Sequence, residues 1–246
     1  MIKPYYETRI MRNYLSFGGG VNSVAMYLYL KDQDIKFEAV FVDHGTDWPE
    51  TYEYVEMFKK KYPLTILKPN VKRNEKIFNN LYKFCEYRNI IPMRYPRWCT
   101  KDFKITPITK YYKKPAFILL GFDFSEINRA KIRIEDGFEY RYPLIEAEMN
   151  RFDCKKYIQS KDLPVPPKSG CFICPFQSVS EWIRLRTEHP SLFCKAQKIE
   201  NLYNKNRESR GLKPTYFSKG SLKAIVEEDQ YKLFKQDEYP PCQCML

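Results

Sequence analysis

A run of three glycines is the first feature of this 246-residue chain that could perform chemistry. Gly18 to Gly20 lie between an extended apolar run, 13–17, and a stretch that predicts a helix, 23–31. Consecutive glycines allow positive φ angles and let an anion approach the backbone amides and the helix N-terminus without a Cβ in the way. Ser23 can cap that helix or donate its hydroxyl to a phosphate oxygen. We therefore expect a phosphate site here, with a purely structural glycine turn as the alternative.

Cysteines are the second chemical feature, and the chain has 8 of them. Cys171 and Cys174 have C-x-x-C spacing in a loop bounded by Gly170 and Pro175. This spacing lets two thiolates point at one metal ion or iron–sulfur cluster. In a reducing compartment such cysteines serve metal binding or catalysis rather than disulfides. The spacing alone does not choose between zinc and iron–sulfur.

The histidines and the other cysteines carry weaker signals. His44 lies beside Asp43 at the end of a predicted strand, where packing is favoured over proton transfer. His189 precedes Pro190 at a predicted helix break, which favours a loop role. Three further cysteines lie in helix-like stretches and are expected to be small buried residues: Cys85, Cys154 and Cys194.

The pattern of apolar runs predicts the scaffold that must position these residues. Strands are expected at 13–17, 37–42, 64–67 and 116–120, and helices at 23–31, 50–62, 75–87 and 104–112. Strands that alternate with helices favour a parallel sheet covered on both faces. Near Tyr142 the chain changes character, with several prolines, the C-x-x-C loop and a charged helical stretch, 179–209, broken at Pro190. We predict an α/β core over 1–145 and a smaller, mostly helical, cysteine-bearing region over 146–246.

Composition narrows the class of protein. With 43% hydrophobic, 29% charged and 16% aromatic residues, the chain is typical of a globular protein rather than a disordered one. No apolar run approaches the roughly 20 residues that span a bilayer, so we expect a cytoplasmic protein with no membrane partner. The formal net charge of +12 favours an anionic partner such as a nucleotide or a nucleic acid. The basic stretch around Trp182 and Tyr203 could hold a phosphate backbone, but a solvated helix surface is the favoured interpretation.

Several short motifs, taken in order, resemble one protein family. Residues 16–23 are similar to an S-G-G-x-D-S loop, and 41–52 are similar to an Asp-Thr-Gly-like segment followed by Pro-Glu-Thr. Gly121, Glu126 and Arg129 are similar to the motif G-x-R-x-x-E-x-x-R. Over about residues 14 to 177 the chain therefore resembles the phosphoadenosine phosphosulfate (PAPS) reductase branch of the PP-loop, or adenine nucleotide alpha hydrolase, superfamily.

This resemblance implies an enzyme with a Rossmann-like parallel sheet that binds an adenine nucleotide, ATP or PAPS. The implied nucleotide-binding residues lie in the glycine loop and at the carboxyl ends of the strands: Ser16, Gly18, Gly19, Gly20, Asn22, Ser23, Asp43 and Gly121. Arg129 would face the anionic end of the nucleotide, and the catalytic candidates are Asp43, Arg129 and Cys244. Gly18 and Asn22 replace the Ser and Asp of the family loop, so a formal negative charge is missing and the use of Mg²⁺ is left open.

For the cysteines the resemblance implies a 4Fe-4S cluster. Three residues match family ligands: Cys99, Cys171 and Cys174. The fourth thiolate would come from Cys242 or Cys244, or the fourth iron would be open, as in cluster-dependent tRNA thiolases of the superfamily. Cys244 is also similar in position to the mobile nucleophile of sulfonucleotide reductases. A zinc ion held by the same cysteines is the alternative cofactor.

Three functions are compatible with these motifs. The first is ATP-dependent sulfur transfer, in which ATP adenylates an acceptor, RNA or DNA being candidates, and a sulfur donor displaces the adenylate. The second is sulfonucleotide reduction, in which a thiolate attacks the bound sulfonucleotide and sulfite is released with the help of an electron donor. The third is a non-catalytic nucleotide-binding module with a structural zinc. The first is favoured, because the cysteine pattern departs from that of the reductases and the basic charge suits a polyanionic acceptor.

Overall fold

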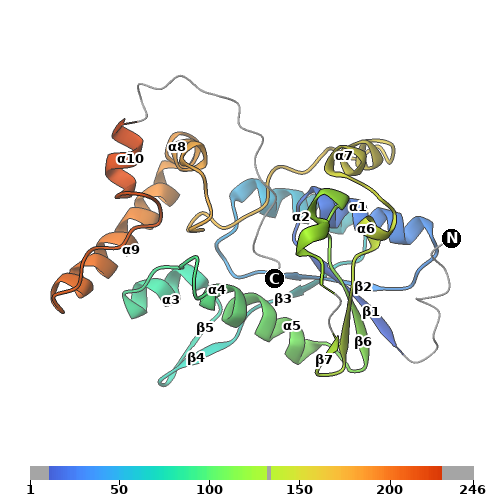
Figure 1. Cartoon of the computed structure of the whole chain (residues 1–246), viewed down its shortest axis with the longest axis horizontal. Coiled ribbons are helices and arrows are strands. Elements are labelled where there is room, and N and C mark those ends of the chain that lie inside the picture. The colour runs from blue at the N-terminus through green and yellow to red at the C-terminus, as the bar shows by residue number, and fades with distance from the viewer. Residues whose placement is uncertain (1–10, 132–133, 229–246) are drawn as a thin grey trace.

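The computed structural model describes residues 11–131 and 134–228, and a six-stranded sheet lies at its centre (Figure 1). The strands run in the order β3-β2-β1-β6-β8-β7, and every neighbouring pair is parallel except β7 with β8. Their bounds are β1 (Arg12–Phe17), β2 (Glu38–Val42), β3 (Thr65–Leu67), β6 (Ala116–Leu119), β7 (Ile134–Glu135) and β8 (Phe138–Arg141). A separate hairpin pairs β4 (Val71–Arg73) with β5 (Lys76–Phe78).

Helices cover both faces of this sheet (Figure 1). One face carries α1 (Val21–Asp32), α2 (Pro49–Lys61), α6 (Pro143–Glu146) and α7 (Arg151–Gln159), and the other carries α5 (Thr106–Tyr111). Successive side chains of a strand point to opposite faces. In β1, Leu15 and Phe17 therefore pack against α1 and α2, whereas Tyr14 stacks on Tyr112 beside α5.

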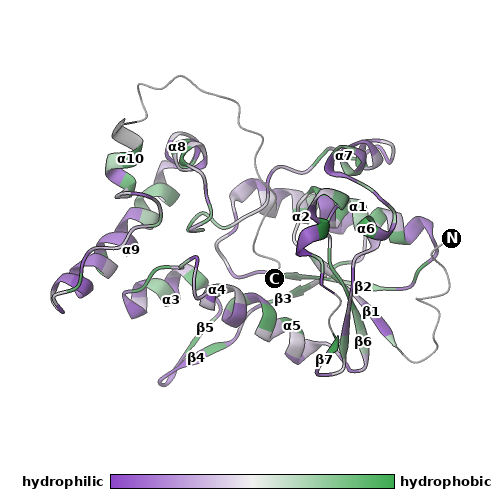
Figure 2. Ribbon diagram, in the orientation of Figure 1, coloured by the Kyte–Doolittle hydropathy of each residue, from purple (hydrophilic) through white to green (hydrophobic). Residues whose placement is uncertain are grey.

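The hydropathy pattern explains this layering (Figure 2). The central strands β2 and β6 are apolar over most of their length, as expected for strands covered on both faces. Helix α1 has nine of its twelve residues buried, because α7 packs against it. Among the described residues, no helix combines the length and the hydropathy that a membrane crossing requires.

The C-terminal helices α8 (Val179–Glu188), α9 (Pro190–Glu208) and α10 (Leu222–Glu228) surround a second apolar cluster. The fully buried Trp182 shares this cluster with Phe103 and with Trp48, which lies between β2 and α2. The helices α3 (Leu81–Arg88) and α4 (Trp98–Thr100) contribute to the same cluster. The arrangement confirms the predicted fold class, a parallel-sheet α/β core with a helical, cysteine-bearing C-terminal region.

Helix α7 shows how closely the α/β core and the C-terminal region are joined. The predicted division at residue 145 assigns α7 to the C-terminal region, yet its Cys154 and Ile158 are buried in the cluster that α1 and α2 share with the sheet. The first helix after the predicted boundary thus packs on the core. The division of the chain into 1–145 and 146–246 stays a prediction.

One predicted helix is wrong in its first part. The expected helix over 75–87 begins as strand β5, and only α3 is helical. Asn74 adopts a φ of 52° in the turn between β4 and β5, a conformation that asparagine tolerates better than most residues. The Asn80 side chain then accepts a hydrogen bond from the Lys83 amide and caps α3. Turn chemistry at these two asparagines therefore outweighs the helical spacing of the segment.

Candidate functional site

A cavity of about 450 Å³ lies at the carboxyl ends of β1, β2 and β6. Open parallel sheets bind their ligands at this edge. One part of its wall is apolar and comes from the sheet and α5: Val40, Ile108, Tyr112, Ile118, Phe138 and Tyr140. The wall also contains several cations: Lys104, Arg129, Lys131, Arg151 and Lys168. The cavity can therefore receive a ligand that has both a flat apolar part and an anionic part.

The glycine loop forms the end of the cavity next to α1. Gly20 is the N-cap of α1, which has no side-chain cap and no acidic residue in its first turn. The Ser23 hydroxyl donates to the Gly20 carbonyl at 3.0 Å, so Ser23 lies inside the first turn and is not the cap that the sequence suggested. Gly19 has a φ of +70°, and a Cβ there would lie 3.0 Å from Val55. The loop thus exposes the N-terminal amides of α1 to an anion.

Gly121 fixes the position of that loop. It follows β6, and a Cβ on it would lie 3.2 Å from the Ser23 backbone nitrogen and 3.3 Å from the Asn22 carbonyl carbon. Because these neighbours are backbone atoms, only glycine allows the end of β6 to pack directly against the first turn of α1. Ser16, Gly18, Gly20, Asn22, Ser23 and Gly121 all line the cavity, whereas a Cβ on Gly19 would face Val55 and Thr51 of α2. Their role in nucleotide binding stays a prediction.

Asn22 lies at the centre of a buried polar network. Its Nδ2 donates to Asp123 Oδ2 at 2.9 Å and to Glu126 Oε2 at 3.0 Å. Its Oδ1 accepts from Arg151 at 3.4 Å. Burial raises the pKa of Glu126, against the opposing effect of Arg129. Two acidic side chains therefore lie directly beside the Asn22 amide.

Arg129 lies at the cavity wall, and its predicted role toward a nucleotide stays a prediction. Its guanidinium pairs with the carboxylate of Glu126 and lies 4.6 Å from the centre of the Phe122 ring. The ion pair with Glu126 and the contact with the Phe122 ring hold the guanidinium in one orientation at the cavity wall. A phosphate or sulfate group entering the cavity would meet the guanidinium there.

Asp43 has a different environment from the one expected. It does not appear among the cavity-lining residues, and its Oδ1 accepts hydrogen bonds from the Gly45 amide and the Tyr52 hydroxyl, both at 3.0 Å. These contacts hold the turn that follows β2. Its direct role in catalysis or nucleotide binding stays a prediction. In the same turn, Asp47 lines the cavity, which sequence reasoning missed.

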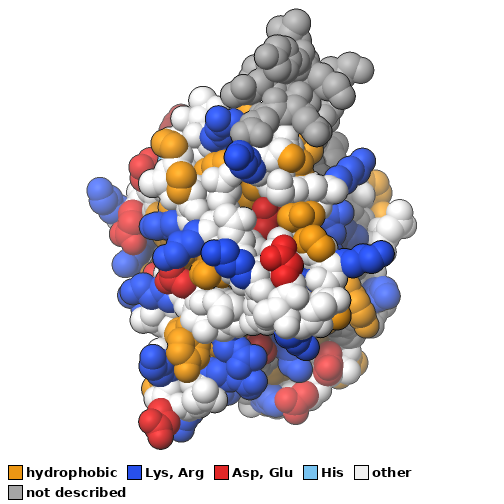
Figure 3. Space-filling model, turned by 90° about the vertical axis from the view of Figure 1, so that its left-hand side faces the viewer, with side chains coloured by type: hydrophobic (Ala, Val, Ile, Leu, Met, Phe, Trp, Pro, Cys, Tyr) orange, Lys and Arg blue, Asp and Glu red, His pale blue; other side chains and the backbone are white. Residues whose placement is uncertain are grey.

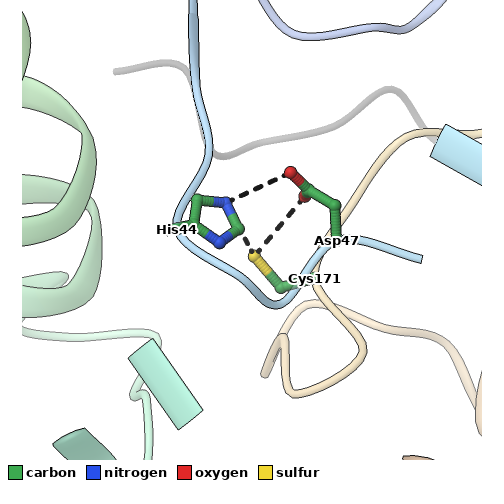
Figure 4. A group of neighbouring side chains, drawn as sticks. All are labelled: His44, Asp47 and Cys171. Atoms are coloured by element: carbon green, nitrogen blue, oxygen red, sulfur yellow. Dashed lines mark hydrogen bonds and ion pairs between the residues drawn. The ribbon is translucent and has the colours of Figure 1, made fainter. Parts of the chain in front are cut away.

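That turn also brings three potential metal ligands together (Figure 4). His44, Asp47 and Cys171 are all buried, and their ligand atoms lie within 4.8 Å of one another. Burial lowers the pKa of His44 to about 4, so the imidazole is neutral at pH 7. Nothing local in the sequence connects Cys171 to His44 or Asp47, which explains why this group was not predicted.

The predicted cluster ligands share one apolar cluster. Cys99 and Cys174, both half-buried, pack against the apolar cluster in which Cys171 is buried, and burial raises the pKa of Cys99. Among the described residues these three sulfurs do not form a group within 4.8 Å. Thiolates on one tetrahedral zinc lie about 3.8 Å apart, so the three do not surround a single ion here. Their assignment stays a prediction, and Cys242 and Cys244 lie outside the described residues.

The remaining cysteines and His189 can be assigned from their surroundings. Cys85 and Cys154 are buried as expected, whereas Cys194 is exposed on α9, which corrects the prediction that it is buried. His189 joins α8 to α9 and lies 3.0 Å from Glu50 Oε1. It therefore helps to attach the C-terminal helices to the start of α2.

Comparison with known proteins identifies the family. The sequence model of one family, described as the phosphoadenosine phosphosulfate reductase domain, matches residues 12–167. The chain is also similar to two uncharacterized proteins of Methanocaldococcus jannaschii. One is 27% identical over an alignment of 213 residues that covers 79% of this chain and 50% of the relative. The other is 27% identical over an alignment of 241 residues that covers 89% of this chain and 47% of the relative. The chain thus spans about half the length of these curated relatives.

A solved structure shows the same fold. The crystal structure of PAPS reductase from Candida auris, in complex with phosphate, superposes with a TM-score of 0.50 at 18% sequence identity. The match covers 64% of this chain and 76% of that one. The family match spans more than half of the chain and includes the glycine loop, Gly121 and Arg129. The chain therefore belongs to the phosphoadenosine phosphosulfate reductase domain family.

Proposed function

We propose that this protein is an adenine-nucleotide-dependent enzyme that adenylates an acceptor for sulfur transfer. The cavity is the observation that carries the proposal. It joins an uncapped helix N-terminus to a group of cations and to an apolar recess. Phosphates suit the first two parts, and an adenine base suits the third. Membership of the family supports nucleotide binding in the same place.

The chemistry needs a bound ATP and an acceptor oxygen. The oxygen attacks the α-phosphorus, a new P–O bond forms, and pyrophosphate leaves with the electrons of the broken bond. A sulfur nucleophile, hydrosulfide in the simplest case, then adds to the activated carbon, and AMP leaves with the former acceptor oxygen. The amides of the glycine loop would bind the phosphates, and Arg129 would stabilise the charge that develops on them.

This activation does not depend on an iron–sulfur cluster. If one is bound by Cys99, Cys171 and Cys174, it would supply iron that can carry or accept sulfur beside the cavity. The Cys171 sulfur also lies 3.6 Å from His44 Nε2 and 3.9 Å from Asp47 Oδ1. No step of the proposed reaction is assigned to a cluster, whose presence stays a prediction.

The net charge of +12 favours a polyanionic acceptor, which makes a nucleic acid the first class to test. The full chain is titrated separately with ATP and with PAPS. It is then incubated with ATP, bulk RNA and hydrosulfide, and pyrophosphate, AMP and thiolated RNA are measured. We expect ATP binding, with pyrophosphate release that requires the acceptor.

A matched pair of variants assigns the activity to the cavity. Arg129→Gln removes a cavity cation and should lower pyrophosphate release at least tenfold, whereas Arg210→Gln, an exposed change outside the cavity, should not. Sulfite release from PAPS would instead support the reductase alternative. If neither nucleotide binds the folded protein, both reactions are excluded.

A further inference from the structure

We propose that His44, Asp47 and Cys171 bind a single divalent metal ion of the zinc class. Their side chains converge from two loops (Figure 4). His44 Nε2 lies 3.4 Å from Asp47 Oδ2 and 3.6 Å from Cys171 Sγ. Cys171 Sγ lies 3.9 Å from Asp47 Oδ1. All three residues are buried, so the donors are sheltered from competing water.

These separations are close to the edge lengths of a zinc coordination tetrahedron. With Zn–N and Zn–O bonds of about 2.0–2.1 Å and a Zn–S bond of about 2.3 Å, neighbouring ligand atoms lie roughly 3.3–3.6 Å apart. The distances from His44 Nε2 to Asp47 Oδ2 and to Cys171 Sγ fit this range. The distance from Cys171 Sγ is to the other carboxylate oxygen, Oδ1, and exceeds the range by a few tenths of an ångström. A mixed set of imidazole, carboxylate and thiolate suits a borderline ion such as Zn²⁺.

The arrangement differs from that of a proton relay. In a nucleophilic triad, the thiol and the carboxylate contact opposite nitrogens of the imidazole. Here Cys171 and Asp47 both approach Nε2, while the Thr46 hydroxyl lies 2.7 Å from Nδ1. One nitrogen cannot donate its single proton to Asp47 and also accept one from Cys171. A metal ion at the shared point uses all three donors, and Thr46 then fixes the ring orientation from behind.

The backbone holds the two ligand-bearing loops in place. Asp47 and Cys171 form an antiparallel bridge. The Trp48 amide donates to the Gly170 carbonyl at 3.0 Å, and the Phe172 amide donates to the Thr46 carbonyl at 2.8 Å. A metal ion would therefore join the segment after β2 to a segment 124 residues later in the sequence. Asp47 and Gly170 also line the cavity, so the ion would border the proposed nucleotide site.

This site differs from the four-cysteine set in its ligands. It uses Cys171 with two non-cysteine donors, and it competes with an iron–sulfur cluster for the Cys171 thiolate. The inference does not depend on nucleotide binding, so the two proposals can fail separately.

The test uses the full chain, depleted of metal by a chelator and titrated with Co²⁺. Co²⁺ replaces Zn²⁺ in tetrahedral sites and reports thiolate ligation as a charge-transfer absorption band. We expect about one equivalent to bind with the band of a single thiolate, and Zn²⁺ to displace it. Asp47→Asn keeps the side-chain shape and should weaken Co²⁺ binding at least tenfold, as should His44→Gln. Cys171→Ser should abolish the band.

Matched controls keep the result interpretable. His189→Gln changes the other histidine, which lies in a second possible metal-binding group with Glu50 and Glu188 that contains no thiol, and it should leave the thiolate absorption band unchanged. Circular dichroism checks that each variant is folded, and Asp47→Asn provides the test if His44→Gln is not. The proposal is overturned if Co²⁺ shows no thiolate band, or if folded Asp47→Asn binds it as well as the wild type. It is also overturned if the band requires Cys99 and Cys174, or if the protein contains iron and sulfide ligated through Cys171.

Discussion

The amide of Asn22 separates two buried carboxylates that would otherwise repel each other. It donates to both Asp123 and Glu126, and both acids are buried. Asn22→Asp would place a third carboxylate within hydrogen-bonding distance of these two. We expect the variant to lose about 1–3 kcal/mol of unfolding free energy at neutral pH. Urea denaturation measures this loss.

Mg²⁺ provides a second measurement on the same variant. Three clustered carboxylates form the kind of oxygen-rich site that Mg²⁺ prefers, so the ion should recover part of the lost stability of Asn22→Asp. Asn201→Asp, at an exposed position on α9, should show neither the loss nor the recovery. Equal stability of wild type and Asn22→Asp without Mg²⁺ would show that the network does not constrain this position.

Gly121 allows a test of the contact between β6 and the glycine loop. In Gly121→Ala the new Cβ would meet backbone atoms at 3.2–3.3 Å, so the first turn of α1 must shift. We expect a loss of about 1–3 kcal/mol of stability, together with weaker ATP binding, since the loop amides move. Gly220→Ala is the matched control, because a Cβ at Gly220 would meet no atom closer than Ile225 at 3.9 Å and Gly220 is not part of the cavity wall. Similar ATP dissociation constants for the two variants would contradict this role.

At the scale of elements, one carboxylate joins α9 to the segment that follows it. Glu200 is 2% exposed and accepts hydrogen bonds from the Phe217 amide at 3.0 Å and the Leu222 amide at 2.9 Å, one on each oxygen. Glu200→Gln would place an NH₂ group against one of these N–H donors. We expect a loss of about 1–3 kcal/mol in urea denaturation. Glu208→Gln, exposed on the same helix, should have little effect.

Glu200 also makes the stability of this region depend on pH. Burial raises its pKa, so the folded protein retains this proton at pH values where the unfolded chain has lost it. The stability that this group contributes is therefore complete below the unfolded pKa and is lost as pH rises through the folded pKa. The stability difference between wild type and Glu200→Gln should be larger at about pH 5 than at about pH 8. A difference that shrinks on acidification would contradict the sign of this shift.

The sequence predicted those elements whose structure depends on residues close together in the chain. The strand, glycine turn and helix around Gly18 to Gly20 were found because three neighbouring features agree. The break between α8 and α9 was found because Pro190 begins the second helix. Strand β8 was missed, because its short, mixed sequence FEYR becomes a strand through pairing with β6. Tertiary pairing of this kind leaves little trace in a single sequence.

In the candidate site, too, short motifs were predicted from the sequence and contacts between distant segments were not. Residues of the glycine loop and Arg129 were predicted, because each belongs to a short motif. Arg151 and Lys168 were missed, since they come from distant segments and carry no motif of their own, and Asp47 was missed because it lies between two matched stretches. The convergence of Cys171 with His44 likewise results from folding, which brings together positions 127 residues apart.

At the scale of the whole molecule, positive charge is widely distributed. On the end of the molecule that carries the C-terminal helices, Lys and Arg side chains spread over the face with acidic and hydrophobic side chains among them (Figure 3). This distribution favours diffuse attraction of polyanions over one nucleic-acid groove. We therefore expect RNA binding that weakens steeply with salt.

Two pairs of charge reversals test this distribution. Lys195→Glu with Lys205→Glu changes exposed positions on α9, and Lys59→Glu with Lys60→Glu changes exposed positions on α2. Each pair alters the net charge equally, so fluorescence anisotropy at fixed salt should show similar losses of RNA affinity. A loss confined to the α9 pair would identify that helix as a specific binding face.

The wall of the cavity extends past the point where the family match ends. The match stops at residue 167, but Lys168, Ser169 and Gly170 line the cavity. A Cβ on Gly20 would lie 2.6 Å from the Ser169 hydroxyl oxygen, so this segment lies directly against the glycine loop. A recombinant fragment trimmed to the family boundary would retain every strand of the sheet and still lack one side of its ligand chamber. A chimera that takes the sheet from a relative must therefore also take the segment equivalent to residues 168–170 from the same relative.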